Sequence, residues 1–250
     1  MEKTALAEYV KYCEQLYLNF VGINQLPNYR ILEKTLQLNL NGGSNLYAVA
    51  SSKYSVSTDT HDLLLFSNFP HPTEHILFHE FTHIWDAETY AKRNPKRSLT
   101  NIGYTGFHAA QVELMKILNA DSIQGKPSFN MDQVVDTYYG KMTVDSYVQR
   151  AYLTASERMQ KQDFPESIQD LLTVIELIFN YLGRRSICKM FAFDYQDAED
   201  DPAISAFIGG DYRWEYLKSH MVCWLDDAAI LKTDEFCGNL IAPYLSQMLI

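Results

Sequence analysis

One short segment of the chain has the residue types and spacing of a metal site. It reads His79-Glu80-Phe81-Thr82-His83, so two histidines lie four positions apart and a glutamate follows the first. On an α-helix, residues four apart lie one turn above each other, and two imidazoles can then reach one metal ion. Glu80 projects to the side of that pair, where its carboxylate can accept a proton from a metal-activated water. The segment predicts a zinc site with Glu80 as general base.

The sequence around this segment has the pattern of an amphipathic helix. Thr73 followed by Glu74 gives an N-terminal capping signal after two prolines, and the helix is expected to run to about Lys92. On a helical wheel His79 and His83 fall on the polar side, opposite the apolar residues Leu77, Phe78, Phe81, Ile84 and Trp85. Chance produces such a motif in roughly one chain in a hundred of this composition. Histidines on the surface of an amphipathic helix are the alternative interpretation.

A catalytic zinc usually takes three protein ligands, so a third ligand is expected elsewhere in the chain. The extended motif HExxHxxGxxH is excluded, because Asp86 and Thr89 stand where its Gly and third His would be. The nearest candidates, His108 and Glu113, lie on a second predicted helix that covers about residues 106–119.

Glu113 is the favoured third ligand. Its neighbours on the helix surface are the small residues Gly106, Ala109, Ala110 and Ala120. Small side chains let two helices approach closely, and a buried carboxylate there would lose its hydration unless a cation met it. His108 lies roughly 140° around the helix from Glu113 and is the alternative ligand, or a hydrogen-bond donor to the transition state. An ordinary solvated carboxylate is the remaining interpretation of Glu113.

Asp86 lies one turn beyond His83 on the same helix face. Metal-bound imidazoles generally donate their second ring N–H to a carboxylate or a carbonyl, and Asp86 is a candidate for that acceptor. A solvent-exposed aspartate is the alternative. A donor for the tetrahedral oxyanion is also expected, and Tyr104, His108 and His220 are the candidates.

The elements that must position these residues are strands early in the chain and helices later. Apolar residues three and four apart predict a helix over the first 20 residues, and period-two alternation then predicts a small sheet. Its strands are expected within 36–49, as a hairpin around Asn41-Gly42-Gly43, and at Tyr54–Ser57 and Asp62–Ser67. The later helices are expected near residues 131–138, 143–161, 166–184, 213–231 and 237–249.

The fold class is therefore α+β. We expect a small mixed sheet with the histidine helix packed on it, followed by a mostly helical C-terminal half. Residues 1–125 would form the catalytic core, and residues 126–250 a helical subdomain packed on it or a continuation of the same domain.

Charge and composition exclude several classes of partner. The 250 residues include 21 Lys and Arg against 31 Asp and Glu, a formal net charge of −10. Such a field repels phosphate backbones and anionic lipids, so no nucleic acid or membrane partner is expected. The best apolar run, Leu171 to Leu182, is interrupted by Glu176 and is too short to cross a bilayer. Four scattered cysteines without a CxxC pair, and no signal-peptide pattern, favour reduced thiols in a cytoplasmic protein.

In its segment from the Asp62–Ser67 strand to Ala120, the chain resembles the gluzincin type of zincin metallopeptidases. In that family HExxH on one helix is completed by a Glu on a following helix, and small cytoplasmic members include the ImmA/IrrE-like peptidases. The resemblance implies a zinc ion held by His79, His83 and Glu113, and hydrolysis of peptide bonds. It also implies a peptide or protein substrate that binds in extended form along the strand before the motif helix, here Asp62–Ser67.

Glu113 matches the family by position and not by the NExxxD context of thermolysin-like enzymes, since the chain reads Gln111-Val-Glu113-Leu. A catalytically inert zincin-like module that binds a partner protein is the alternative function. Hydrolysis of a non-peptide amide or ester at the same site is a third. The sequence selects no particular substrate or oligomeric state.

Overall fold

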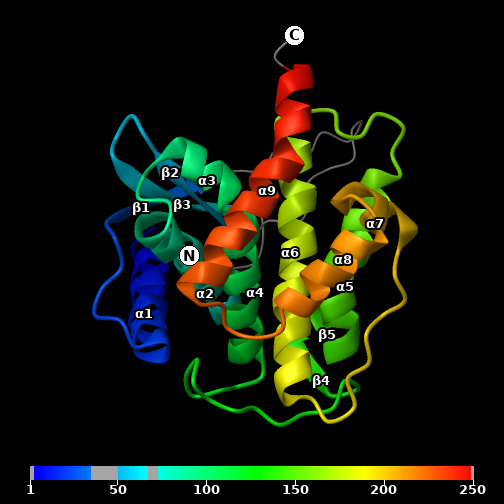
Figure 1. The fold of residues 1–250 in the computed structure, drawn as a ribbon. Coiled ribbons are helices and arrows are strands. Elements are labelled where there is room, and N and C mark those ends of the chain that lie inside the picture. Colours follow the sequence, from blue (N-terminus) through cyan, green and yellow to red (C-terminus); the bar gives the residue numbers. More distant parts are fainter. Residues whose placement is uncertain (1–2, 35–49, 67–72, 249–250) are drawn as a thin grey trace.

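Helices make up most of the chain in the computed structural model, which describes residues 3–34, 50–66 and 73–248 (Figure 1). The predicted α+β class is confirmed: a small mixed sheet lies in the N-terminal part, and the C-terminal half is mainly helical. The strands are β1 (Tyr29–Lys34), β2 (Ala50–Ser55), β3 (Thr60–Phe66), β4 (Val134–Thr137) and β5 (Gly140–Thr143). The helices are α1 (Lys3–Val21), α2 (Glu74–Thr89), α3 (Pro95–Thr100), α4 (Ile102–Ile117), α5 (Val144–Met159), α6 (Ile168–Phe191), α7 (Pro202–Ile208), α8 (Asp211–His220) and α9 (Asp227–Met248).

The first sheet has the strand order β1-β3-β2. β3 lies in the centre, parallel to β1 and antiparallel to β2, so its backbone groups are paired on both sides. The side chains of residues 61–65 are all buried, so both faces of β3 are covered. The expectation that Asp62–Ser67 binds a substrate backbone is therefore wrong for its described part, because residues 62–65 of β3 are paired with β1 on one side and with β2 on the other. Among the described strands, β2 is the one at the edge beside α2.

The helix that carries the two histidines packs on this sheet and on α1. Four residues of its apolar face are fully buried, namely Leu77, Phe78, Phe81 and Ile84. Phe78 and Phe81 make ring contacts with Tyr17 of α1 at centroid distances of 5.4 and 5.5 Å. On the opposite side α2 packs against α4. The predicted separation of an apolar and a polar face thus orients His79 and His83 away from the sheet.

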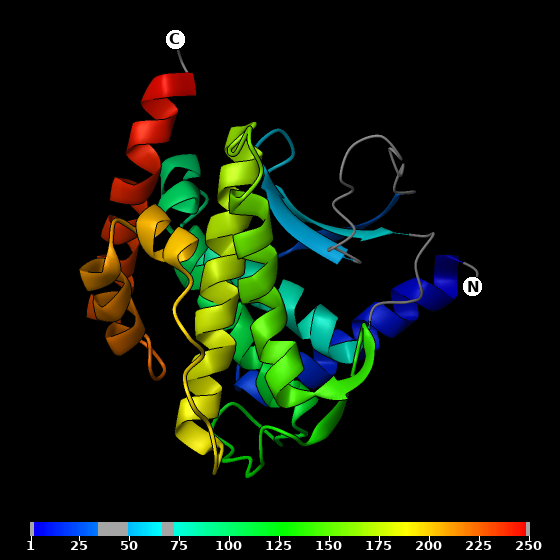
Figure 2. The ribbon, with the colours of Figure 1, turned by 90° about the vertical axis from the view of Figure 1, so that its right-hand side faces the viewer.

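Helices α4 and α6 approach each other closely because α6 has a glycine at the contact. A Cβ atom on Gly183 would lie 2.1 Å from the carbonyl oxygen of Phe107 in α4. α5 and α6 form a helical pair that runs beside α4, and Figure 2 shows them between the first sheet and the C-terminal helices. The close approach brings side chains of α4, α5 and α6 together in one layer.

The secondary structure of the C-terminal half agrees only in part with the sequence-based expectation. The helices expected near 143–161 and 166–184 are α5 and α6. The helix expected at 131–138 is wrong: this region contains the β4–β5 hairpin, where burial alternates along β4 and Gly140 supplies a positive φ of 91° at the turn. The predicted helix 213–231 is divided into α8 and the start of α9, and α9 continues through 237–248. The predicted hairpin within 36–49 lies outside the described residues.

One hydrophobic cluster includes buried residues from both sides of residue 125, among them Phe78, Phe107, Tyr147 and Phe179. The contacts between α4 and α6 cross the same position. Within the described ranges, none of the helices is both long and apolar enough to span a membrane.

The contact at Gly183 predicts a substitution effect. Gly183→Ala should lower the free energy of unfolding by about 2–3 kcal/mol, because the new methyl group meets a backbone atom that cannot rotate away. Gly238→Ala in α9 is the matched control: its nearest neighbour is a side-chain methyl of Thr100 at 3.3 Å, and alanine raises helix propensity by up to about 1 kcal/mol. Urea denaturation of both variants measures the difference. Equal stability of the two would contradict the close approach.

Candidate metal centre

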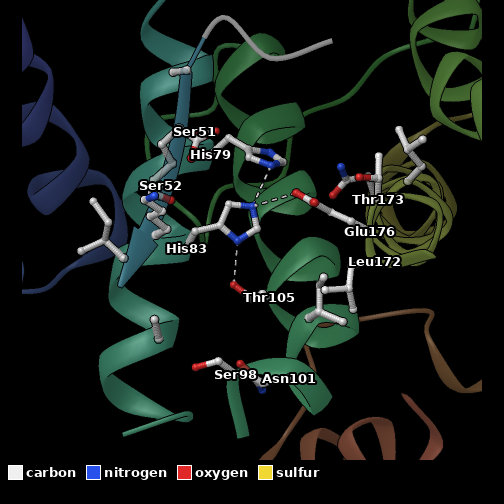
Figure 3. A pocket seen from close by; sticks show the side chains of 18 of the residues that line it. Ser51, Ser52, His79, His83, Ser98, Asn101, Thr105, Leu172, Thr173 and Glu176 are labelled. Atoms are coloured by element: carbon white, nitrogen blue, oxygen red, sulfur yellow. Dashed lines mark hydrogen bonds and ion pairs between the residues drawn. The ribbon is translucent and has the colours of Figure 1, made fainter. Parts of the chain in front are cut away.

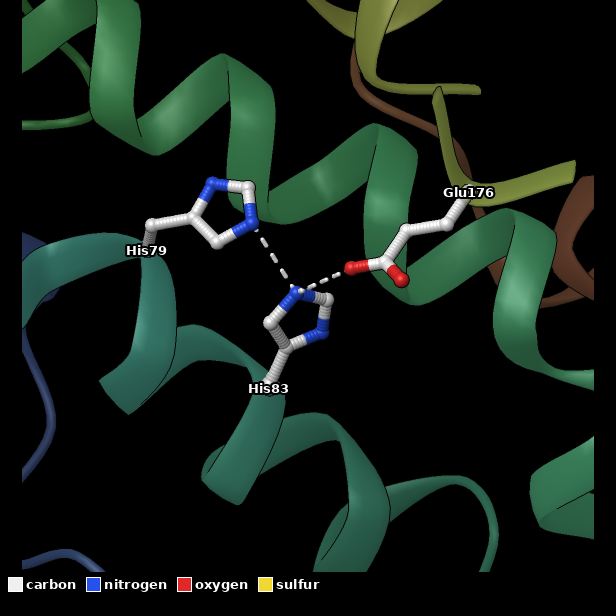
Figure 4. Close-up of side chains that lie close together, drawn as sticks. All are labelled: His79, His83 and Glu176. Carbon is white, nitrogen blue, oxygen red and sulfur yellow. Dashed lines mark hydrogen bonds and ion pairs between the residues drawn. The ribbon is translucent and has the colours of Figure 1, made fainter. Parts of the chain in front are cut away.

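The imidazoles of His79 and His83 face each other from successive turns of α2. Their Nε2 atoms lie 3.0 Å apart, and Oε1 of Glu176 from α6 lies 3.6 Å from Nε2 of His83 (Figure 4). The three ligand atoms of this group all lie within 4.8 Å of one another. Two histidines and one carboxylate are a donor set that zinc takes in catalytic sites. The predicted histidine pair is thus joined by a glutamate from a helix nearly a hundred residues later.

The other nitrogen of each ring has a hydrogen-bond partner. Nδ1 of His79 lies 3.1 Å from Oε2 of Glu113, and Nδ1 of His83 lies 2.9 Å from the hydroxyl of Thr105. A carboxylate only accepts, so Nδ1 of His79 carries the hydrogen. The Thr105 hydroxyl interacts with the buried carboxylate of Asp86, so it donates there and accepts from His83. Both rings are held with Nε2 turned towards Glu176.

This arrangement suits a cation between the two rings. Two neutral imidazoles that donate through Nδ1 present lone pairs at Nε2, and lone pairs 3.0 Å apart repel unless a proton or a metal ion lies between them. Burial works against a charged imidazole, but the Glu113 carboxylate raises the pKa of His79 above its ordinary value. For His83, burial and the neighbouring His79 lower the pKa well below the ordinary value. The pair therefore fits a shared cation, and its donor set fits zinc.

The structure places Glu113 differently from the sequence-based prediction. Its carboxylate is 1% exposed and contacts Nη2 of Arg184 at 3.0 Å, the hydroxyl of Tyr147, and Nδ1 of His79. Burial alone would raise the pKa of Glu113, but Arg184 and His79 hold it well below its ordinary value. Glu113 thus accepts the Nδ1–H of His79, on the side of the ring opposite the Nε2 pair. A cation does meet this buried carboxylate, but it is the Arg184 guanidinium, with the Nδ1–H of His79 beside it.

Sequence reasoning did not select Glu176 as a candidate ligand. Its side chain is 37% exposed and points from α6 towards the histidines (Figure 4). The available signal was its position as the one charged residue within the apolar run from Leu171 to Leu182. In a helix that is apolar on several sides, a single carboxylate indicates either an exposed face or a specific partner. Only the tertiary structure shows that the partner is the pair on α2.

Asp86 and His108 form a pair beside the group, outside the metal-ligating atoms. Asp86 is fully buried, and Nδ1 of His108 lies 3.0 Å from each of its carboxylate oxygens. The acceptor for Nδ1–H of His83 is Thr105 and not Asp86, which interacts with the Thr105 hydroxyl from the other side. His108 packs against the rings of Tyr104 and Trp224 and is not brought to the Nε2 pair.

Glu80 lines the same cavity as the three ligand residues. Its side chain is buried, and its backbone carbonyl accepts a hydrogen bond from the Ser52 hydroxyl of the edge strand. Burial raises the pKa of Glu80 to about 7. A carboxyl group with this pKa can both accept and release a proton near neutral pH.

The cavity at this site has a volume of about 840 Å³. Its walls are the edge strand β2, one face each of α2, α5 and α6, and the helix ends near Ser98, Asn101 and Thr105 (Figure 3). None of the three predicted oxyanion donors lines this cavity, namely Tyr104, His108 and His220. The lining includes instead Arg150, Arg158 and Arg184.

Comparisons of the chain with protein-family models, with curated proteins and with solved structures give no match. The interpretation of the site therefore depends on its own geometry: the facing Nε2 atoms, their Nδ1 partners, and two glutamates in one cavity.

Substitution of Glu176 and of Glu113 distinguishes a metal ligand from a residue that orients a ligand. Glu176→Ala should weaken zinc binding by more than about 100-fold, beyond the roughly 10–100-fold typical for a residue that orients a ligand. The metal-free protein should keep its stability, because the Glu176 side chain is partly exposed. Chelator competition measures the affinity, and urea denaturation in EDTA measures the stability.

Glu113→Ala should give the reverse pattern. It leaves the Arg184 guanidinium buried without its carboxylate, which costs about 3–5 kcal/mol of stability without metal. Zinc affinity should fall by only about 10–100-fold. A larger loss of zinc affinity in Glu113→Ala than in Glu176→Ala, with stability retained, would make Glu113 the ligand.

Proposed function

We propose that this protein is a zinc-dependent peptidase. The observation that carries the proposal is the pair of Nε2 atoms 3.0 Å apart, with Glu176 beside them and Glu80 in the same cavity. The two histidines and Glu176 would hold the ion. The chemistry that a bound zinc ion supplies is polarisation of a carbonyl and a lowered pKa of water.

Glu80 is the proposed general base. It accepts a proton from the attacking water and passes it to the amine of the leaving product. Its buried position keeps bulk water from competing for that proton, and its raised pKa suits both transfers. Glu113 and Thr105 would orient the ligand histidines without binding the ion. Each accepts an Nδ1–H and so keeps Nε2 free for the ion.

The substrate class follows from the wall of the cavity opposite α6. β2 is one of the two edge strands of the first sheet as described, and its residues 50–54 line the cavity. An extended peptide can add to such an edge through backbone hydrogen bonds. This geometry supports a peptide or a protein loop as the substrate, with β2 in the role that the sequence assigned to Asp62–Ser67.

We also propose a cytoplasmic location, with peptide or protein substrates as the partners. All four cysteines are free thiols, and three of them are buried, which is consistent with a reducing compartment. The net charge of −10 disfavours nucleic acid and anionic lipid as partners.

The base substitution tests this function. Purified protein should contain close to one equivalent of zinc and cleave an unstructured protein such as casein. Glu80→Gln should keep the zinc and lower kcat by about 100-fold or more, because the amide cannot accept the proton. Glu88→Gln is the control: it lies on the same helix but outside the cavity lining, and should leave kcat unchanged.

Three outcomes would contradict parts of the proposal. A zinc content below about a tenth of an equivalent would reject the peptidase and favour a catalytically inert protein-binding module. Full activity in Glu80→Gln would reject Glu80 as the base. Zinc-dependent cleavage of amide or ester compounds alone, without cleavage of any peptide, would reject the substrate class.

A further inference from the structure

One arginine on the cavity wall has no anionic partner. Among the described residues the Arg150 guanidinium has no ion pair, and its Nε is buried without a hydrogen-bond partner. Its contact is with the ring of Tyr139, 3.8 Å from the guanidinium carbon to the ring centroid. The other two arginines of the wall are paired, Arg184 with Glu113 and Arg158 with Asp170. Arg150 thus brings an uncompensated positive charge to the cavity.

The stacking on Tyr139 leaves the hydrogen-bonding edge of Arg150 available. A guanidinium that lies over an aromatic face still has all of its N–H groups in its own plane, and this planar fork matches the two oxygens of a carboxylate. Leaving a buried donor without a partner costs free energy, which a bound carboxylate would recover. The chemistry of the wall therefore selects a planar anion in preference to a neutral or cationic group.

Arg150 lies on the His79 side of the metal-ligating group. It is one turn beyond Tyr147 on α5, and the Tyr147 hydroxyl contacts Glu113, which holds His79. Tyr139 is close enough to Arg184 to interact with it electrostatically. The chain of contacts from Arg150 to His79 thus runs along one end of the cavity.

The helix geometry gives an approximate distance. The backbone oxygen of Tyr147 accepts from Arg184, which sets these two residues level on α5 and α6, and at the other end Arg158 pairs with Asp170. Along the helix axes Arg150 then lies about 4.5 Å from this level, and Glu176 about 12 Å from it in the same direction. The axial offset between Arg150 and Glu176 is then roughly 7 Å, and roughly 3 Å when it is counted from the pair of Arg158 and Asp170 instead. This range corresponds to about one to two residues of an extended peptide.

We propose that Arg150 forms a carboxylate-binding subsite, so that the cavity selects peptides with a carboxylate within about three residues of the cleaved bond. The inference rests on the proposed peptidase function and deepens it. The carboxylate belongs either to an Asp or Glu side chain or to a free C-terminus, and the two sources share the same chemistry at the guanidinium.

A peptide library tests the proposal and separates the two sources. Zinc-loaded wild-type protein is incubated with one random library prepared both as free acids and as C-terminal amides, and the products are identified by mass spectrometry. A side-chain carboxylate gives enrichment of Asp and Glu at one position in both forms. A terminal carboxylate gives cleavage at a fixed distance from the C-terminus in the free acids only.

Variants of Arg150 then assign the preference to this side chain. Arg150→Gln should lower kcat/KM for the preferred acidic substrate by roughly 10–100-fold, and leave a neutral substrate within about twofold of the wild type. Arg150→Glu should shift the preference to Lys and Arg at the same position. Arg213→Gln, an exposed arginine of α8, is the control and should change neither substrate.

The proposal is overturned if the wild type shows no preference for a carboxylate, or if Arg150→Gln slows all substrates equally. Failure of the peptidase function is a separate outcome, which calorimetric titration with the same acidic and neutral peptides distinguishes. If no peptide is cleaved, acidic peptides should still bind zinc-loaded wild type at least about tenfold more tightly than Arg150→Glu. Equal binding to both proteins would reject the subsite as well.

Discussion

The buried carboxylate of Glu113 connects four helices, and the candidate site depends on it. From α4 it contacts His79 of α2, Tyr147 of α5 and Arg184 of α6. A buried ion pair of this kind contributes little net stability compared with an apolar contact, but it strongly penalises any arrangement that separates its members. The main effect of the carboxylate is therefore on the geometry of the site. It fixes the tautomer of His79 and the relative positions of the helices that line the cavity.

The close approach of α4 and α6 allows this connection. Gly183 leaves room for the carbonyl of Phe107, and the next residue, Arg184, is thereby brought within reach of Glu113. A side chain at position 183 would separate the helices and leave a guanidinium and a carboxylate buried without each other. The small residues that surround Glu113 in the sequence serve the same approach, so the packing of the helices and the electrostatics of the site have one origin.

The local part of the site was predictable from the sequence, and the tertiary part was not. The spacing of His79 and His83, the helix around them and the position of Glu80 are contained in one short stretch, where helical periodicity alone fixes the geometry. The burial of Glu113 was also predictable, from its small neighbours. Its partner Arg184 lies 71 residues later, and nothing local distinguishes a carboxylate that binds a metal from one that pairs with an arginine. Glu176 was missed for the same reason.

The errors in the predicted fold have a related cause. The β4–β5 hairpin consists of two strands of four residues each, too short for period-two alternation to stand out from a helical pattern. The assignment of the substrate strand to Asp62–Ser67 used chain order, whereas strand order in the sheet decides which strand has a free edge. β2 precedes β3 in the chain but lies outside it in the sheet, and its residues 50–54 line the cavity. In the proposed function a bound peptide would meet β2 on one side and the charged residues of α5 and α6 on the other, so the overall charge of −10 does not describe the charge along the cavity wall.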